Sequence, residues 1–228
     1  MTLNKLKMAL YSLWLTNYYG FKLSGVTDPL KRKEARIEYS LKLLKKLNLH
    51  VKVINQDKVP KDGQYLLASN HRTIIDPLIV EAATCKSNIH GDWIAKKELY
   101  NSFFFGKFVR NLGTILLDRE SSNKGGFFKD IKESVKSGNS IYIFPEGTRN
   151  KTDSAIAEFK EGAQIISVKN RLPILPVFIR SRANEVLKEA LNDSSVEREI
   201  EIEIGDVIDY KDRELPFAEN YKKQFNIQ

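Results

Sequence analysis

A histidine and an aspartate five positions apart, His71 and Asp76, are the residues best suited to chemistry in this 228-residue chain. An imidazole held by a carboxylate is the base half of a hydrolytic triad, and no serine or cysteine nucleophile visibly accompanies this pair. A base without a protein nucleophile indicates that the nucleophile arrives with the substrate, as the hydroxyl of an acceptor molecule.

The chain must turn between these two residues if they are to meet. On an unbroken helix, positions five apart differ in direction by roughly 140°. The apolar run 65–69 predicts a short buried strand, and Asp76-Pro77 predicts a helix start with Asp76 as the N-cap. Taken alone, the pair is better explained as a helix cap beside a hydrogen-bonded loop histidine.

A second polar turn follows the apolar strand predicted at 141–144. Pro145 ends that strand, Gly147 permits a tight turn, and Arg149 offers a planar fork suited to phosphate or carboxylate. Alone, this segment is equally a charged surface turn with an internal contact between Glu146 and Arg149. Only the two segments together indicate a site.

Together, the segments 70–76 and 144–149 resemble the glycerolipid acyltransferase family, most closely its bacterial 1-acyl-glycerol-3-phosphate acyltransferases. Three further segments stand in the order that the family shows: 113–119, 159–163 and 172–177. The resemblance covers roughly residues 50–180. One departure is Leu116-Leu117, where the family often has phenylalanine and isoleucine. This difference affects the surface that contacts the acyl chain and leaves the catalytic residues unchanged.

The resemblance implies a role for each matching residue. His71 would be the general base that takes the proton of the acceptor hydroxyl, and Asp76 would orient it. The residues implied in binding the acceptor phosphate are Arg149, Glu146, Gly147 and Thr148, with Arg119 as a second cation. Backbone N–H groups near the start of the helix after Asp76 are candidate oxyanion donors. Arg72 receives no role, and Lys107 and Lys160 are better explained as solvated lysines.

The resemblance also implies the reaction. A fatty acyl group would pass from acyl-CoA or acyl-carrier protein to the free hydroxyl of 1-acyl-glycerol-3-phosphate, which gives phosphatidate. No metal or bound cofactor is expected, because no zinc-ligand spacing, Walker loop or dinucleotide fingerprint occurs. Three alternatives stay open: another acceptor such as glycerol-3-phosphate or a different lyso-lipid, a lipid-surface binding protein with an idle site, and a thioesterase that uses water.

The first fifty residues carry +7 of the net charge of +8, because they hold ten Lys or Arg and only three Asp or Glu. Five aromatic side chains lie in the first half of this segment: Tyr11, Trp14, Tyr18, Tyr19 and Phe21. The uncharged run 8–21 is shorter than the ~20 residues that span a bilayer. Basic and aromatic side chains together favour peripheral docking on anionic lipids at the cytoplasmic face of a membrane. No motif indicates a nucleic-acid partner.

Two helices joined near Ser24-Gly25 are expected in this segment. Asp28-Pro29 predicts the start of the second helix. Its apolar side is expected at Leu30, Ile37, Leu41, Leu44 and Asn48. The alternative is that the first helix packs on the core of its own domain and that the basic run is a solvated face.

Beyond residue 50, predicted strands alternate with predicted helices. The strands are expected at 51–54, 65–69, 93–95, 114–117, 141–144, 174–179 and 200–204, and the main helices at 103–112, 129–136 and 161–169. This order predicts an α/β fold with a mixed central sheet and helices on both faces, preceded by an amphipathic two-helix membrane-docking motif. The expected parts are that motif at 1–49 and an acyltransferase domain at 50–228. The single cysteine, Cys85, allows no internal disulfide, which suits the cytoplasm.

Overall fold

The computed structural model describes residues 3–120, 123–212 and 214–227. Its helices are α1 (Leu3–Lys22), α2 (Pro29–Lys46), α3 (Asp76–Ala83), α4 (Gly106–Asn111), α5 (Gly125–Lys136), α6 (Gly162–Asn170), α7 (Ala183–Asn192) and α8 (Phe217–Phe225). Its strands are β1 (Leu49–Ile54), β2 (Leu66–Ser69), β3 (Gly91–Lys96), β4 (Thr114–Leu117), β5 (Ser140–Ile143), β6 (Ile174–Ile179) and β7 (Arg198–Ile204). Two short 3₁₀ helices are η1 (Gln56–Lys58) and η2 (Lys97–Asn101).

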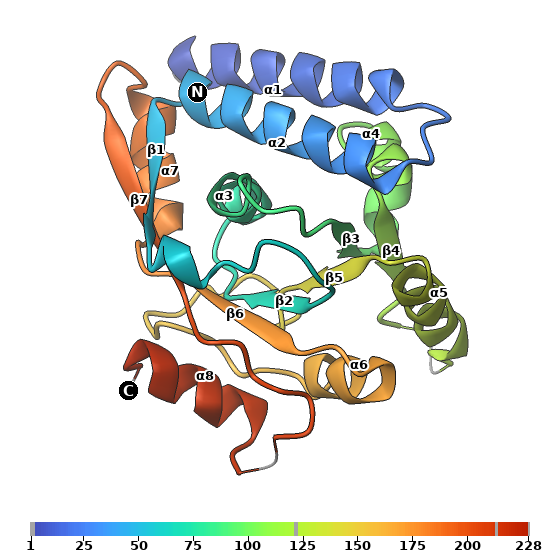
Figure 1. Cartoon of the computed structure of the whole chain (residues 1–228). Helices are drawn as coiled ribbons and strands as arrows, with labels where there is room; N and C mark the ends of the chain where they lie inside the picture. The colour runs from blue at the N-terminus through green and yellow to red at the C-terminus, as the bar shows by residue number, and fades with distance from the viewer. Residues whose placement is uncertain (1–2, 121–122, 213, 228) are drawn as a thin grey trace.

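The described strands form one mixed sheet in the order β1-β7-β6-β2-β5-β3-β4 (Figure 1). The strands from β6 to β4 run parallel to one another, whereas β7 pairs antiparallel with β6 and carries β1 parallel to itself. The central strands β2 and β5 are apolar on both faces, and Leu66, Leu67, Ile141 and Tyr142 are buried. Continuous apolar runs of this kind form strands that are covered on both sides.

Helices cover both faces of this sheet (Figure 1). On one face, residues of α1, α2, α3 and α7 share a buried cluster with the sheet, which includes Ile79 and Ala190. On the other face, α5, α6 and α8 contribute Ile131, Ile166 and Tyr221 to a second cluster. The predicted mixed α/β architecture is therefore confirmed.

The predicted strands all occur, and their ends differ from the prediction by at most two residues. The helix predicted at 103–112 is shorter, because the Ser102 hydroxyl oxygen accepts the N–H groups of Phe104 and Phe105 before α4 begins. The helix predicted at 129–136 begins earlier, at Gly125. The prediction missed α7 and α8, although the apolar residues of α7 recur at helical spacing.

The buried side of α2 differs from the predicted side. Asp28 caps the helix as predicted and accepts the N–H of Leu30 at 2.9 Å. Leu30 itself is 49% exposed and Leu41 is 47% exposed, whereas the charged Arg36 is buried. Arg36 forms an ion pair with Glu81 of α3 at 2.6 Å. The predicted apolar face was wrong at the two leucines because a buried charge with a partner sets the rotation of the helix.

Helix α1 has one buried side and one exposed apolar side. Leu15 and Tyr19 are buried in the core that α1 shares with α2 and the sheet. Gly20 allows close contact with α4, since a Cβ there would come within 2.9 Å of the Phe108 backbone nitrogen. An exposed row recurs every three or four residues, and it consists of Leu3, Leu6, Leu10, Trp14, Tyr18 and Phe21.

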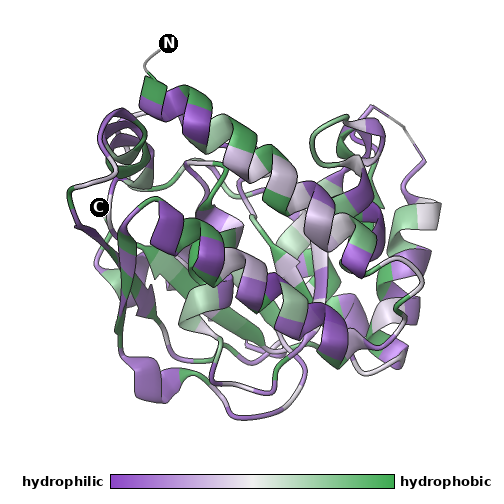
Figure 2. Cartoon of the chain, turned by 90° about the horizontal axis from the view of Figure 1, so that it is seen from above, coloured by the Kyte–Doolittle hydropathy of each residue, from purple (hydrophilic) through white to green (hydrophobic). Residues whose placement is uncertain are grey.

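Figure 2 shows this helix from above, with hydrophobic and hydrophilic residues alternating along its ribbon. Packing on the domain core, which was the alternative for this helix, accounts for one side of α1 and leaves the outward row unexplained. Within the described residues, no helix has the length and apolar character needed to cross a bilayer.

Candidate active site

The two polar segments lie at the ends of neighbouring parallel strands. The pairing of β2 with β5 places Leu66 opposite Ile141 and Ala68 opposite Ile143. His71 stands just beyond β2, and Glu146 stands just beyond β5. Parallel strands end at one edge of a sheet, and ligand sites of open α/β sheets form there. The sheet therefore brings both segments to the same edge.

The turn after β2 brings His71 and Asp76 into contact. The ring nitrogen Nδ1 of His71 lies 2.7 Å from Oδ2 of Asp76. The same oxygen accepts the N–H of Arg72 at 2.6 Å and that of Thr73 at 2.8 Å. The Asp76 side chain is 0% exposed and that of His71 is 18% exposed. Three donors hold the carboxylate against the imidazole, which leaves Nε2 as the ring nitrogen that can take a substrate proton.

Asp76 is the first residue of α3 and not its N-cap, which corrects the sequence prediction. Ile75 occupies the cap position and provides no side-chain hydrogen bond. Pro77 follows at a position where its missing N–H removes no helical bond. The carboxylate turns back to the preceding loop, so its hydrogen bonds fix the turn and the imidazole rather than the helix end.

The predicted oxyanion donors at the start of α3 are already occupied. The N–H groups of Leu78 and Ile79 both donate to the carbonyl oxygen of Ile75, and the N–H of Asp76 donates to that of Thr73. Pro77 has no N–H to offer. The stabiliser of a tetrahedral intermediate must therefore lie elsewhere than in this first turn.

The loop after β5 holds the backbone of His71 on both sides. The N–H of His71 donates to Oε1 of Glu146 at 2.7 Å, and its carbonyl oxygen accepts the N–H of Asn150 at 2.6 Å. Oε2 of Glu146 accepts the N–H of Ala157 at 3.0 Å. Burial raises the pKa of the Glu146 carboxyl, while these two N–H donors act in the opposite direction. Glu146 therefore braces two loops, and each of its carboxylate oxygens already accepts a backbone N–H.

Arg149 reaches the surface next to this brace. Its side chain and that of Thr148 are exposed, and neither makes a hydrogen bond or an ion pair within the part of the chain that the structure describes. The contact with Glu146 that the sequence allowed is absent there. Gly147 adopts a φ of 69°, a conformation that costs glycine little. A guanidinium free of protein partners can bind a phosphate or carboxylate.

The other cations singled out from the sequence lie in different surroundings. Arg119 is exposed just beyond β4, at the same sheet edge but two strands from β5, or on the order of 10 Å away at ordinary strand spacing. Lys107 places its Nζ 3.3 Å from the centroid of the Phe21 ring of α1. Lys160 forms an ion pair with Glu158 at 3.0 Å. Arg149 thus lies in the loop whose backbone contacts His71, whereas Arg119 lies further along the rim.

Three further residues within the two motifs make contacts that the sequence did not reveal. The Asn70 side chain exchanges two hydrogen bonds, of 3.1 and 2.8 Å, with the backbone of Ile179 at the end of β6. The Arg72 guanidinium donates to carbonyl oxygens in the loop 152–154. The ring of Phe144 stacks on the imidazole. Their places in the motifs were the only signal, since these partners lie far away in the sequence.

Mixed α/β sheets serve proteins of many functions, so the site and not the fold narrows the class: an imidazole held by a carboxylate has the geometry of a general base. A model of the acyltransferase family matches residues 50–180. The chain belongs to this acyltransferase family.

Known relatives and a solved structure agree with this family. The chain is 38% identical over 130 residues to the 1-acyl-sn-glycerol-3-phosphate acyltransferase of Helicobacter pylori, a match that covers 55% of this chain and 53% of the relative. It is 30% identical over 137 residues to the enzyme of that name from Bacillus subtilis, covering 60% and 66%. The matches thus span from about half to just under two thirds of these relatives.

The structural likeness is more extensive. The crystal structure of the 1-acyl-sn-glycerophosphate (LPA) acyltransferase PlsC from Thermotoga maritima matches with a TM-score of 0.69. The match covers 98% of this chain and 91% of that one, at 23% sequence identity. At this identity, the likeness shows that the fold is shared.

The brace formed by Glu146 leads to a prediction about stability. Glu146→Gln replaces one acceptor oxygen by an NH₂ group, which then faces the N–H of either His71 or Ala157. One hydrogen bond is lost and buried donors stay unpaired, so the free energy of unfolding should fall by ~1–3 kcal/mol. Urea unfolding measures this change. The matched variant Glu158→Gln, at a side chain that is 84% exposed, should unfold like the wild type. Equal stability of Glu146→Gln and the wild type would contradict the brace.

Proposed function

We propose that this protein transfers a fatty acyl group from acyl-CoA or acyl-carrier protein to the free hydroxyl of 1-acyl-glycerol-3-phosphate, which yields phosphatidate for phospholipid synthesis. The observation that carries the proposal is the shared sheet edge. There, His71 is held by Asp76 through Nδ1, and Arg149, which has no protein partner among the described residues, extends from the loop that clamps the His71 backbone. The names of the relatives support the substrate class.

The dyad has the geometry of a general base for a hydroxyl. Nε2 of His71 takes the hydroxyl proton as the oxygen attacks the thioester carbonyl, and a tetrahedral intermediate forms. Collapse of that intermediate breaks the C–S bond, and the imidazolium returns its proton to the leaving thiolate. Asp76 fixes the ring orientation and stabilises the imidazolium while it is charged. General-base catalysis of this kind contributes typically 10²–10⁴-fold in rate.

Arg149 binds the acceptor through its phosphate and thereby positions it. Its guanidinium presents a planar fork that matches the oxygens of a phosphate. In 1-acyl-glycerol-3-phosphate, the free hydroxyl and the phosphate are on adjacent carbons of the glycerol. A phosphate at Arg149 therefore keeps the hydroxyl near the ring of His71. Glycerol-3-phosphate carries the same phosphate and lacks the acyl chain, whereas a lyso-lipid with a headgroup presents a phosphodiester at this contact.

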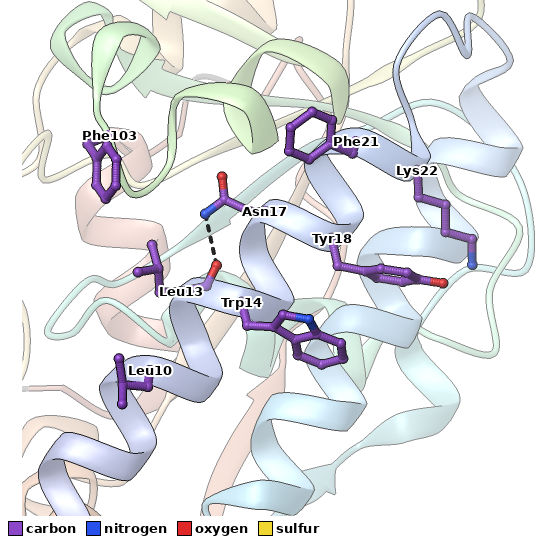
Figure 3. Close-up of a pocket in the computed structure, with 8 residues that line it drawn as sticks. All are labelled: Leu10, Leu13, Trp14, Asn17, Tyr18, Phe21, Lys22 and Phe103. Atoms are coloured by element: carbon purple, nitrogen blue, oxygen red, sulfur yellow. Dashed lines mark hydrogen bonds between the residues drawn. The ribbon is translucent and has the colours of Figure 1, made fainter.

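The outward side of α1 supports docking on an anionic lipid surface. Leu10, Trp14, Tyr18 and Phe21 line a surface hollow together with Phe103, which is 89% exposed (Figure 3). The surrounding segment carries the excess of Lys and Arg described above. Aromatic and aliphatic side chains insert at the headgroup level, while lysines attract anionic lipids. We infer a peripheral position at the cytoplasmic face of a membrane, where the lyso-lipid acceptor is met.

Product identification tests the proposed reaction. Purified protein is incubated with labelled acyl-CoA or acyl-carrier protein, vesicles, and a panel of lyso-lipids and glycerol-3-phosphate. We expect labelled phosphatidate from the wild type and none from folded His71→Ala, because that variant lacks the imidazole that takes the hydroxyl proton. Appreciable transfer by folded His71→Ala would contradict the dyad. Free fatty acid as the only product would indicate a thioesterase, and no product at all an idle lipid-binding protein.

Arg149→Ala should weaken acceptor binding more than donor binding. Loss of the phosphate contact should raise the acceptor KM by roughly tenfold or more, with a much smaller effect on the acyl-donor KM, because a hydrogen bond to a charged group contributes ~1.5–3 kcal/mol. Lys151→Ala removes one charge from the same loop and is the matched control, for which both KM values should stay close to the wild type. An equal rise of both KM values in Arg149→Ala, or a rise for the donor only, would count against the assignment.

The docking side of α1 is best tested by surface substitutions. Removal of the first 24 residues would also remove Leu15 and Tyr19 from the core, so Leu10→Ser combined with Trp14→Ser is preferable, each being 59% exposed in the wild type. We expect several-fold weaker co-sedimentation with vesicles that contain anionic lipid, because the buried apolar area is lost.

The matched control replaces two exposed valines elsewhere, Val196→Ser with Val207→Ser, which are 49% and 42% exposed in the wild type. This variant should bind vesicles like the wild type. Unchanged vesicle binding of the α1 variant would contradict docking through the exposed side of α1.

A further inference from the structure

The imidazole of His71 lies almost flat on the ring of Phe144, the residue that follows β5. The ring centroids are 4.0 Å apart and the ring planes differ by 11°. Asp76 holds one edge of the imidazole through Nδ1, and Phe144 covers one of its faces. The hydrogen bond to Asp76 leaves the ring free to tilt about Nδ1, and the stack on Phe144 alone leaves it free to turn in its own plane. Together, the two contacts determine the direction in which Nε2 points.

Phe144 also stacks against Trp93 of β3. The two rings stack with centroids 5.1 Å apart and an interplanar angle of 28°. The indole N–H of Trp93 donates to Oε1 of Glu81 at 2.8 Å. The same oxygen forms the buried ion pair with Arg36, whose Nη1 donates to the carbonyl oxygen of Leu112 at 2.8 Å. The stack therefore rests on a buried, hydrogen-bonded ion pair and has little freedom to slide.

We propose that Phe144 is a positioning residue for the acyl transfer, and that the stack of Trp93, Phe144 and His71 sets the orientation of the base. This inference rests on the proposed function. The aromatic face keeps the imidazole in the plane in which Asp76 holds Nδ1, and it excludes water from one side of the ring. When His71 takes the hydroxyl proton, the π face of Phe144 also attracts the imidazolium. Trp93, which is hydrogen-bonded to Glu81, keeps the ring of Phe144 stacked on the imidazole of His71.

A purely structural role for Phe144 predicts a different pattern. An apolar side chain that only fills space between β5 and the loop is replaceable by another of similar size with a small effect. It has no reason to alter which ring nitrogen of His71 carries the proton. The two roles are therefore separable by a variant that keeps the apolar bulk and removes the flat ring.

The test compares Phe144→Leu, which removes the ring, with Phe144→Tyr, which retains it. Steady-state kinetics should show that kcat of Phe144→Leu falls by about tenfold to a hundredfold with both KM values nearly unchanged, because misplacement of the base affects the transition state. Phe144→Tyr should restore most of the rate. A folded Phe144→Leu with wild-type kcat would overturn the proposal. The matched control is Phe127→Leu on α5, a ring that packs edge-on against Phe128 at 5.4 Å and should leave kcat unchanged.

A second readout does not depend on activity. Nitrogen-15 NMR of the imidazole in substrate-free protein reports which ring nitrogen carries the proton, and His71 is assigned by substituting His50 and His90. The wild type should show one neutral tautomer with the proton on Nδ1, and Phe144→Leu a mixture. The same single tautomer in both would overturn the proposal. If the wild type transfers no acyl group to any acceptor, the proposed function fails, and the NMR result alone then decides whether Phe144 orients His71.

Thermal unfolding identifies which variants are folded. Should Phe144→Leu fail to fold, Trp93→Phe takes its place, since it keeps an aromatic ring against Phe144 but removes the indole N–H that donates to Glu81 and part of the stacked ring area. The expected result is a smaller loss of kcat, again with unchanged KM values, and a partly mixed tautomer. A wild-type rate together with a wild-type tautomer would overturn the proposal by this route as well.

Discussion

The two hydrogen bonds between the loop after β5 and the backbone of His71 are the interactions on which the site depends. Glu146 accepts the N–H of His71, Asn150 donates to its carbonyl oxygen, and the second carboxylate oxygen of Glu146 holds the loop at Ala157. These bonds form only because β2 and β5 are parallel neighbours. The loop that carries Arg149 is therefore fixed to the loop that carries His71 through backbone hydrogen bonds. No direct contact between the two side chains is needed to hold the loops together.

The N-terminal helices are joined to the same framework. Arg36 of α2 is paired with Glu81 of α3, the helix whose first residue is Asp76, and Leu15 and Tyr19 of α1 lie in the core shared with the sheet. The exposed row on α1 is thus carried by a helix that packs on the domain containing the dyad. If that row docks on a lipid surface, the orientation of α1 also sets the orientation of the sheet edge. The division of the chain into a docking motif at 1–49 and an acyltransferase domain at 50–228 stays a prediction.

Much of the architecture was predictable because it depends on local patterns. Apolar runs bounded by turn residues located the strands, and the need for a turn between His71 and Asp76 followed from helix geometry. What the sequence concealed depends on partners far away in the chain. Arg36 is buried because it pairs with Glu81. Both carboxylate oxygens of Glu146 accept backbone N–H groups, of His71 and of Ala157, which lie far from it in the sequence or across a loop. A residue type shows which bonds a side chain can make, but not which groups the fold places beside it.

In the proposed reaction, His71 acts on a hydroxyl whose molecule is held by its phosphate at Arg149. The most direct measurement compares kcat/KM for lysophosphatidate and for monoacylglycerol, which lacks the phosphate, in the wild type and in Arg149→Ala. Removal of the phosphate should cost the wild type roughly tenfold to a hundredfold, as expected for a hydrogen bond to a charged group, and should cost Arg149→Ala little. If Arg149→Ala discriminates between the two acceptors as strongly as the wild type does, the phosphate is bound elsewhere and Arg149 is not its ligand.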